Sequence, residues 1–364
     1  TEIVEVGGSA TAPIVNRFGY ELIGWSVDFS NVTSNITTVV QYKKISALAV
    51  KENGIWINIP KIYKKISGTW VEQANTNWVL LFDSNVKYIK NEIPIIPTAI
   101  LYSDGAFVFS RDNSIDNSHG EVIAKYIGWD TNTYSYSTLP WIDNVNYIKS
   151  VYINDVNVKS TKYWFYKCES LTDINFFGFD TSDTTNMQAM FHTCSGLTSI
   201  DLNDFNTSNV TDMGAMFDNC SGLTSIDLSN FDTSNVTNMN SMFYSTGFNS
   251  TNLTLDLSSL DTSNVTDMNS MFLNAGKNST NFTLDLSSFD TSNVTDMRSM
   301  FYSTGRKNPT FTLDLGDNFN TSNVTNMDSM FAGTGYSSSI FTLDVSNFDT
   351  SNITNMRDMF SGTG

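Results

Sequence analysis

The stretch Phe-Asp-Thr-Ser-Asn-Val-Thr-Asn-Met-Asn-Ser-Met-Phe at residues 231–243 decides the fold of this chain, because close copies of it recur along more than half of the sequence. The copies begin at residues 179, 205, 231, 260, 289, 319 and 348. A repeat of 26 to 30 residues is typical of stacked supersecondary units, each of which buries its apolar face only against its neighbours. We therefore expect a repeat architecture over residues 168–364.

Each copy predicts a short helix that follows a strand. Val236, Met239, Met242 and Phe243 fall on one helical face, after the cap-forming run 232–234. The phrases that precede the copies, such as 223–228, alternate apolar and polar residues as strands do. The expected fold class is an α/β repeat solenoid, leucine-rich-repeat-like, with a strand and a short helix in each of seven coils. Small all-β and β-grasp-like modules are expected before it.

Composition divides the chain into segments. All fourteen methionines lie in the seven copies, where they are expected to fill the core, whereas all seven tryptophans lie between residues 25 and 164. The predicted domains are a partial β-grasp-like module at 1–42, a β-hairpin-rich connector at 43–97, an N-terminal cap of the solenoid at 98–167, and the solenoid at 168–364. Within the connector, Asn53-Gly54 and Ser67-Gly68 predict the turns of two hairpins.

The negative charge of the chain resides in the repeats. The formal net charge is −17, and residues 168–364 contain 22 acidic but only 5 basic side chains. Such a surface repels nucleic acid and anionic membranes, so we expect no nucleic-acid partner. No apolar run reaches the length of a membrane span, which predicts no membrane insertion in this segment.

A row of acidic residues raises the question of a metal ion. Asp201, Asp227, Asp256, Asp285, Asp314 and Asp344 occupy one repeat position, and Asn175 begins the row. Stacked carboxylates could bind Ca²⁺, which requires six to eight oxygen ligands, but Asp and Asn also recur simply because they cap turns. We expect no cofactor and no metal site, and Ca²⁺ remains the open alternative.

Cysteine and histidine argue against catalysis. Cys168, Cys194 and Cys220 share one repeat position and are expected to be buried free thiols. His119 and His192 are the two histidines of the chain, and neither lies at a motif spacing from a nucleophile. We therefore expect no enzymatic activity.

Ligand recognition is expected where the repeats differ from one another. The position after each Met-Phe varies (His192, Asp218, Tyr244, Leu273, Tyr302), as do the loops inserted in the longer coils. Aromatic and arginine side chains on loops over a rigid scaffold are typical binding anchors. The candidate ligand-binding residues are Tyr244, Phe248, Lys277, Tyr302, Arg306, Lys307 and Tyr336.

Two resemblances accompany this interpretation. The repeat phrase, with Leu-Thr-Ser-Ile-Asp-Leu at 197–202 before it, resembles the BspA-like leucine-rich repeat surface proteins of bacteria, and the likeness extends upstream through 99–105, 126–131, 139–141 and 163–168. Residues 1–42 resemble the internalin B-type repeat, also called the Listeria–Bacteroides repeat, through 4–8, Gly24-Trp25 and Gln41-Tyr42. The resemblances imply a spacer module and a capped solenoid on a cell surface.

The expected function is therefore non-enzymatic recognition or adhesion by a rigid acidic rod. Its expected partners are a protein or a glycan on a host-cell or bacterial surface, with homo-oligomerisation in a fibre left open. The expected location is extracellular, on a bacterial surface. The alternative is a structural or host-binding component of a phage tail fibre or another appendage, located on a virion. Both ends of the sequence are expected to continue into further polypeptide.

Overall fold

The computed structural model describes the six strands that lie between residues 20 and 72, and then residues 98–110, 116, 118–127, 135–154 and 156–364. The chain forms two compact units, 1–94 and 95–364. Strands of the first unit pair antiparallel: β1 (Tyr20–Trp25) with β2 (Val40–Lys44), β3 (Ala49–Glu52) with β4 (Ile55–Asn58), and β5 (Tyr63–Ile66) with β6 (Thr69–Glu72). The last two pairs fall on the stretches predicted as hairpins. The rest of the predicted 1–42 module lies outside the described residues.

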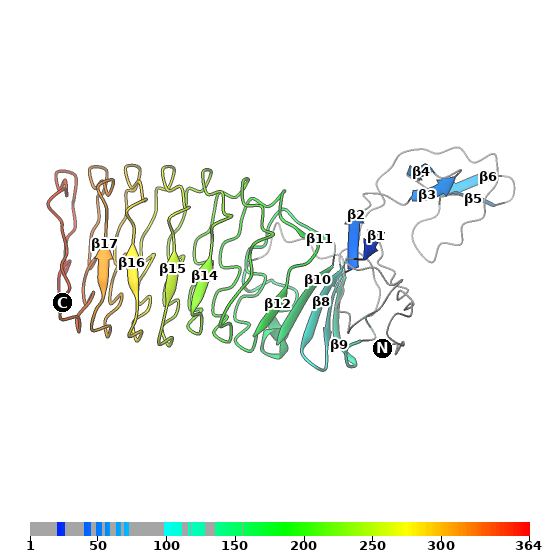
Figure 1. The fold of residues 1–364 in the computed structure, drawn as a ribbon, viewed down its shortest axis with the longest axis horizontal. Helices are drawn as coiled ribbons and strands as arrows, with labels where there is room; N and C mark the ends of the chain where they lie inside the picture. The colour runs from blue at the N-terminus through cyan, green and yellow to red at the C-terminus, as the bar shows by residue number, and fades with distance from the viewer. Residues whose placement is uncertain are drawn as a thin grey trace, which may run out of the picture. The chain divides into compact units, whose positions relative to one another are not determined.

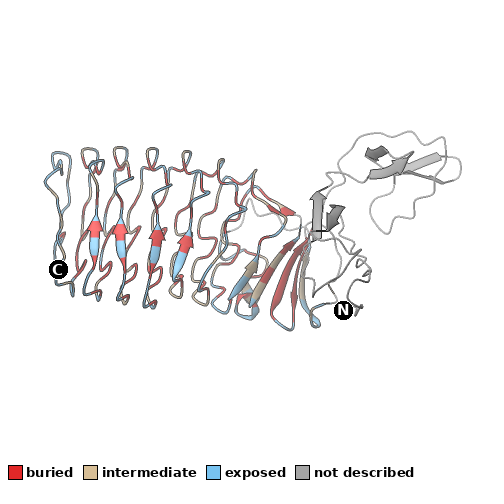
Figure 2. Ribbon diagram, viewed as in Figure 1, coloured by how far each residue is buried: buried red, intermediate tan, exposed pale blue. Residues whose placement is uncertain are grey.

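The second unit begins with a five-stranded mixed sheet in the order β12-β10-β8-β7-β9. Its strands are β7 (Thr98–Tyr102), β8 (Ala106–Ser110), β9 (Val122–Ile127), β10 (Ser150–Asn154) and β12 (Asp173–Asn175). β7 and β8 are buried along their whole length (Figure 2). The rings of Phe109 and Trp164 stack at 5.0 Å, and Trp141 Nε1 donates to the Trp164 carbonyl at 2.7 Å. These aromatic residues belong to the same hydrophobic core as the repeats that follow.

Residues 159–364, called the repeat stack from here on, form coils that lie side by side in chain order (Figure 1). One parallel β-bridge joins each coil to the next at Ser160, Asn186, Asp212, Asn238, Asp267, Asp296, Asn326 and Asn355. Short strands add parallel pairs: β11 (Val156–Asn157) with β13 (Phe179–Asp180), β14 (Ser225–Asp227) with β15 (Thr254–Asp256), and β16 (Thr283–Asp285) with β17 (Thr312–Asp314). Only the middle residue of each strand from β14 to β17 is buried.

The predicted helix in each coil is absent from the structure. Among the described residues, the one helix is a 3-10 helix, η1 (Ile142–Tyr147), and it precedes the repeat stack. The fold class predicted above, an α/β repeat solenoid with a strand and a short helix per coil, is therefore wrong. The described residues are almost entirely turns and short strands in small sheets.

Left-handed residues explain why the Met-x-x-Met-Phe segment is not helical. In the coil of residues 231–253, Ser241 has φ 52° and Ser245 has φ 51°, a region that breaks a right-handed helix. The Met242 N–H donates to the Met239 carbonyl at 3.2 Å and so forms a turn within the coil. The Phe243 N–H donates instead to the Met271 carbonyl of the next coil at 2.9 Å. Successive amides thus alternate between a turn within the coil and a hydrogen bond to its neighbour.

This alternation keeps equivalent side chains one above another. One column of rings contains Phe165, Phe191, Phe217, Phe243, Phe272, Phe301, Phe331 and Phe360. Neighbouring rings of the column stack with centroids 5.3 to 5.9 Å apart. The methionines fill the core beside them as predicted, except that Met356 in the last coil is 48% exposed.

The cysteines belong to a second column that was only partly visible in the sequence. All three are buried free thiols, as predicted, and Cys220 Sγ donates to the Phe191 carbonyl of the preceding coil at 3.1 Å. Threonine takes this position in most of the longer coils, and Ala275 takes it in one of them. Thr246 Oγ1 donates to the Phe217 carbonyl at 2.9 Å, and Thr304 Oγ1 donates to the Phe272 carbonyl at 2.7 Å. The position therefore requires a small side chain, and in most coils that side chain donates a hydrogen bond to the preceding coil.

We predict that Thr304→Val, which keeps the size of the side chain and removes its hydroxyl, destabilises the protein by about 1 kcal/mol, because a buried hydrogen bond is lost. The matched control is Thr280→Val, whose exposed hydroxyl donates to the Thr251 carbonyl at 3.2 Å and can be replaced by water. Thermal unfolding of the two variants checks the difference. Equal losses of stability would contradict the role assigned to the buried column.

Candidate functional site

The structure gathers five of the seven candidate binding residues into one row. Phe248, Lys277, Arg306 and Tyr336 each follow a glycine with positive φ in consecutive long coils, and Lys307 follows Arg306. We call these five residues the basic–aromatic row. The Lys307 N–H donates to the Lys277 carbonyl at 2.9 Å, and the Ser337 N–H donates to the Arg306 carbonyl at 3.0 Å. The row is therefore held in register by the backbone of the stack.

Aromatic rings hold two of the cations. Lys277 Nζ lies 5.4 Å from the centroid of the Phe248 ring, and Arg306 Cζ lies 4.5 Å from the centroid of the Tyr336 ring. Both distances are within the range of cation–π attraction. From one coil to the next, the row therefore contains an aromatic ring, a cation, a second cation and a second aromatic ring. Lys307 adds a third cation beside Arg306. Tyr336 is 57% exposed and Lys307 is exposed, whereas Phe248, Lys277 and Arg306 are half-buried.

The loops that carry the three cations contain no acidic residue. The cations make up three of the five basic residues in 168–364, and the loop segments 244–253, 273–282, 302–311 and 332–341 contain no Asp or Glu. Arg298 and Arg357 pair with Asp296 and Asp358, at 3.3 and 3.2 Å. In the part of the chain that the structure describes, no carboxylate forms such a pair with a cation of the row. Burial, together with the charges of Arg306 and Lys307, lowers the pKa of Lys277.

Gly333 makes room for the row on the following coil. Its φ is 71°, and a Cβ placed there would meet Nη1 of Arg306 and Ser303 Oγ. Because the guanidinium of Arg306 occupies the space that a Cβ would take, it lies against the backbone of the next coil on its way to Tyr336. This glycine is a positioning residue that the sequence alone did not reveal.

Tyr244 and Tyr302, the other two candidates, occupy a different row. It consists of the residues directly after each core phenylalanine, which we call the post-Phe row: Tyr166, His192, Asp218, Tyr244, Leu273, Tyr302 and Ala332. Tyr302 is 41% exposed, whereas Tyr244 is half-buried and burial raises its pKa. Buried Thr246 and Thr304 separate the two rows along the chain. The seven predicted residues therefore do not form one site.

The post-Phe row brings together a histidine and an aspartate that the sequence analysis had set aside. His192 stacks on Tyr166 at 4.7 Å, and its Nε2 lies 3.4 Å from Asp218 Oδ2. His192 Nδ1 is 2.8 Å from Thr193 Oγ1, and Asn219 Nδ2 donates to Asp218 Oδ1 at 2.7 Å. Burial raises the pKa of Asp218 to about 7 and lowers the pKa of His192, so burial opposes the ion pair that this separation would otherwise form. The sequence places the two residues at the same position of successive repeats, but it does not show that their side chains meet.

The acidic row predicted as a possible Ca²⁺ site has a structural use. Asp227 Oδ1 accepts the Ser229 N–H at 2.9 Å, and Asp256 Oδ1 accepts the Ser258 N–H at 3.1 Å. These are Asx-turns, and the hydrogen bonds lower the pKa of both carboxyl groups. Within the described residues, no group of three or more His, Cys, Asp or Glu side chains is placed to hold a metal ion. The absence of a cofactor stays a prediction, and Ca²⁺ binding by the acidic row stays the alternative to it.

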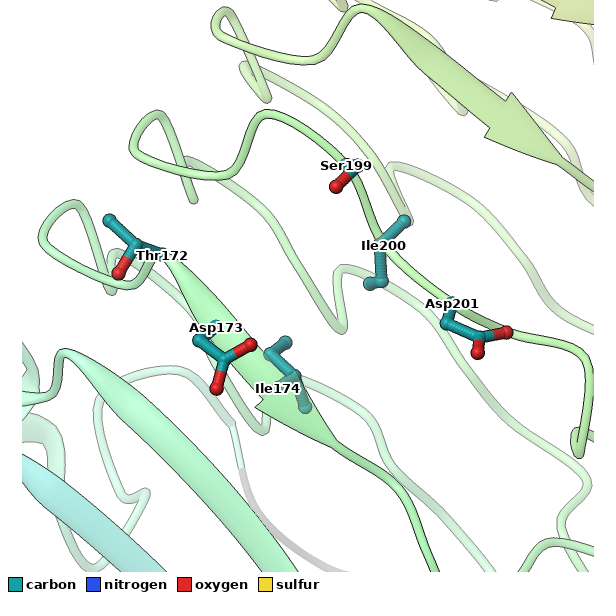
Figure 3. Close-up of a pocket in the computed structure, with 6 residues that line it drawn as sticks. All are labelled: Thr172, Asp173, Ile174, Ser199, Ile200 and Asp201. Carbon is teal, nitrogen blue, oxygen red and sulfur yellow. The ribbon is translucent and has the colours of Figure 1, made fainter. Parts of the chain in front are cut away.

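A small cleft opens between two coils near the start of the stack. It has a volume of about 150 Å³ and is lined by 172–174 on one coil and 199–201 on the next (Figure 3). β12 pairs with β10 on its other edge, and 199–201 belongs to no described strand, so the cleft marks an interruption of the sheet. It contains none of the candidate binding residues.

In the described part of the chain, no helix is long and apolar enough to cross a membrane. The expectations of no enzymatic activity and no nucleic-acid partner stay predictions.

Comparison with known proteins gives one informative likeness. The family described as "Mycoplasma protein of unknown function, DUF285" matches residues 159–277, 223–314 and 277–364, which together cover the repeat stack and more than half of the chain. No curated protein and no solved structure matches the chain. The resemblances to BspA-like and internalin B-type proteins therefore stay predictions.

The His192–Asp218 contact predicts a pH-dependent stability. The pKa of Asp218 is raised from 3.8 to about 7 in the fold. Its contribution to the free energy of unfolding is therefore fully present below pH 3.8 and is lost as the pH rises through 7. His192, with a lowered pKa, contributes in the opposite sense, and its contribution is lost as the pH falls below 6.5. We predict that Asp218→Asn raises the melting temperature relative to wild type at about pH 7.5, and that this gain shrinks towards pH 4.

The control for this experiment is Asp256→Asn. Asp256 is exposed and its pKa is lowered, so its contribution is constant above about pH 4 and the variant should differ from wild type by a constant amount. Thermal unfolding followed at several pH values between 4 and 7.5 provides the measurement. A pH-independent effect of Asp218→Asn would show that the Asp218 carboxyl is ionised throughout this range.

Proposed function

The chain belongs to the family described as "Mycoplasma protein of unknown function, DUF285", and we propose that its repeat stack is a non-enzymatic scaffold for recognition or adhesion. The binding surface is the basic–aromatic row. The observation that carries the proposal is the placement of three cations and two aromatic rings, from consecutive coils, in loops that lack acidic residues on an otherwise acidic stack.

The construction of the stack supports this proposal. The loops of the row are additional to the shorter coils, since the coils that contain them are 29 or 30 residues long rather than 26. The backbone bonds that join Lys277, Lys307 and Arg306 to their neighbours are the same ones that hold the coils together. Exposed variable side chains on a rigid frame are the usual arrangement of a binding surface, because little entropy is lost when they engage a partner.

Arginine and tyrosine are also the residue types that most often dominate binding energies. The proposed ligand is a protein or a glycan on the surface of a host cell or a bacterium, and the proposed location of the protein is extracellular. The resemblance of the repeats to bacterial surface proteins supports that location.

A structural role is the second candidate, and one observation favours it. Parallel bridges run without interruption from Ser160 to Asn355, so the stack sets a defined distance between its two ends. An element of this kind could serve as a spacer in a surface fibre or in a phage tail, without a ligand of its own. The two roles differ in whether the basic–aromatic row matters.

We predict that the full chain binds saturably to the surface of intact bacterial or animal cells, and that Lys277→Gln/Arg306→Gln/Lys307→Gln weakens this binding at least about tenfold, because the attraction depends on the three charges. The control is Lys162→Gln/Arg298→Gln/Arg357→Gln, which changes the net charge equally. It includes one cation–π contact, since Lys162 Nζ lies 5.1 Å from the ring centroid of Tyr163.

Binding of fluorescently labelled protein to a panel of cells provides the measurement, and circular dichroism checks that each variant is folded. Equal loss in the two triple variants would mean that only the net charge matters. Absence of binding by the wild type to every cell in the panel would favour the structural role.

A further inference from the structure

The unpaired charges of the row define what kind of ligand fits it, which deepens the function proposed above and rests on it. We propose that the basic–aromatic row binds an acidic glycan, a sugar chain that carries carboxylate or sulfate groups, with the chain lying along the axis of the stack.

The first argument is the arrangement of charge. Lys277 and Arg306 occupy the same loop position in adjacent coils, and Lys307 lies beside them. The proximity of Arg306 and Lys307 contributes to the lowered pKa of Lys277, so the three cations repel one another in the free protein. A ligand with negative charges at matching intervals removes this repulsion. A single small anion would neutralise only part of the row.

The second argument is spacing. Coils joined by parallel bridges lie about 4.8 Å apart, which is close to the length of one sugar unit in a linear chain. Equivalent groups on successive coils therefore repeat at the interval at which sugar units repeat. The aromatic residues at the two ends, Phe248 and Tyr336, limit the charged part of the row to the two coils between them.

The third argument is preorganisation. The rings already hold Lys277 and Arg306, at 5.4 and 4.5 Å, so these long side chains have less freedom to lose on binding. Gly333 leaves the space in which the guanidinium of Arg306 lies. The charges are therefore placed before a ligand arrives, as they are in sites that recognise fixed patterns of anions.

The fourth argument is the chemistry around the charges. The same loops expose hydroxyl and amide side chains, including Asn249, Thr251, Thr280, Thr310 and Ser337. These groups suit the hydroxyls of a sugar chain. The acidic surface of the rest of the stack disfavours an anionic membrane as the partner.

The test is isothermal titration calorimetry of the full chain with a sulfated, uronic-acid-containing hexasaccharide. Two further probes are the same hexasaccharide without sulfates and with its carboxyl groups reduced, and a hexaglutamate peptide. We expect the acidic hexasaccharide to bind at least about tenfold more tightly than either of the other probes. Raising the salt concentration from about 0.05 M to about 0.5 M should weaken this binding, because the charges are screened.

Variants locate the binding to the row. We expect Lys277→Gln/Arg306→Gln/Lys307→Gln to lose at least about tenfold in affinity, and the charge-matched control of Lys162, Arg298 and Arg357 to bind as the wild type does. Arg306→Lys keeps the charge but loses the planar group over Tyr336, and it should give an intermediate affinity. All these variants change side chains at the surface of the coils, and their melting temperatures verify that the stack is intact.

The outcomes separate this inference from the proposed function. Equal binding of hexaglutamate and the acidic hexasaccharide would overturn the inference in favour of an acidic protein partner. Tight binding of the neutral hexasaccharide, or binding that the triple row variant retains, would overturn it as well. If cells bind through the row while no acidic hexasaccharide does, the recognition function stands and the ligand class is wrong.

Discussion

Hydrogen bonding between the backbones of successive coils is the constraint on which the rest of this structure depends. Every second amide in the 239–245 segment donates to the next coil, and the amides between them close turns within their own coil. Left-handed residues such as Ser241 and Ser245 make this alternation possible, because they turn the chain without building a helix. The phenylalanine column and the Cys/Thr column follow from it, since each coil must sit in register on the one before.

The same constraint creates the surface. A residue in a given slot of one coil has the residue in the same slot of the next coil as its neighbour, so any slot that varies becomes a row of different side chains. The basic–aromatic row and the post-Phe row are two such rows. The first contains three cations, and the second contains the half-buried His192–Asp218 contact. Side chains that could act together on this fold therefore lie in rows along the stack axis rather than around a pocket.

Much of this organisation could be predicted from the sequence, and the failures have physical causes. The repeat, the methionine core and the buried thiols were predictable because they depend on hydrophobic spacing alone. The prediction of a helix was wrong because its apolar pattern does not distinguish a helix from a coil of tight turns. In either structure, Val236, Met239, Met242 and Phe243 can lie on one buried side. The residue before the second Met has positive φ but is Ala, Ser or Asp, so its identity does not predict a left-handed conformation. The position four residues later also has positive φ, and there Asn219, Asn274 and Gly333 are residue types that favour it. Of the candidate site, the loops could be predicted, but the separation of Tyr244 and Tyr302 from the other residues required the geometry of the coil.

The coil-to-coil bridges also determine how the stack responds to tension. When the chain is pulled from one end of the stack, the coil at that end is bridged on one side only, so it can detach while the bridges between the remaining coils stay in place. Each detached coil of 29 residues releases about 100 Å of extended chain, in place of the 4.8 Å or so that it occupied in the stack. The repeat stack would therefore yield in steps, as an extensible tether does, while the coils that have not yet detached keep their side chains in place.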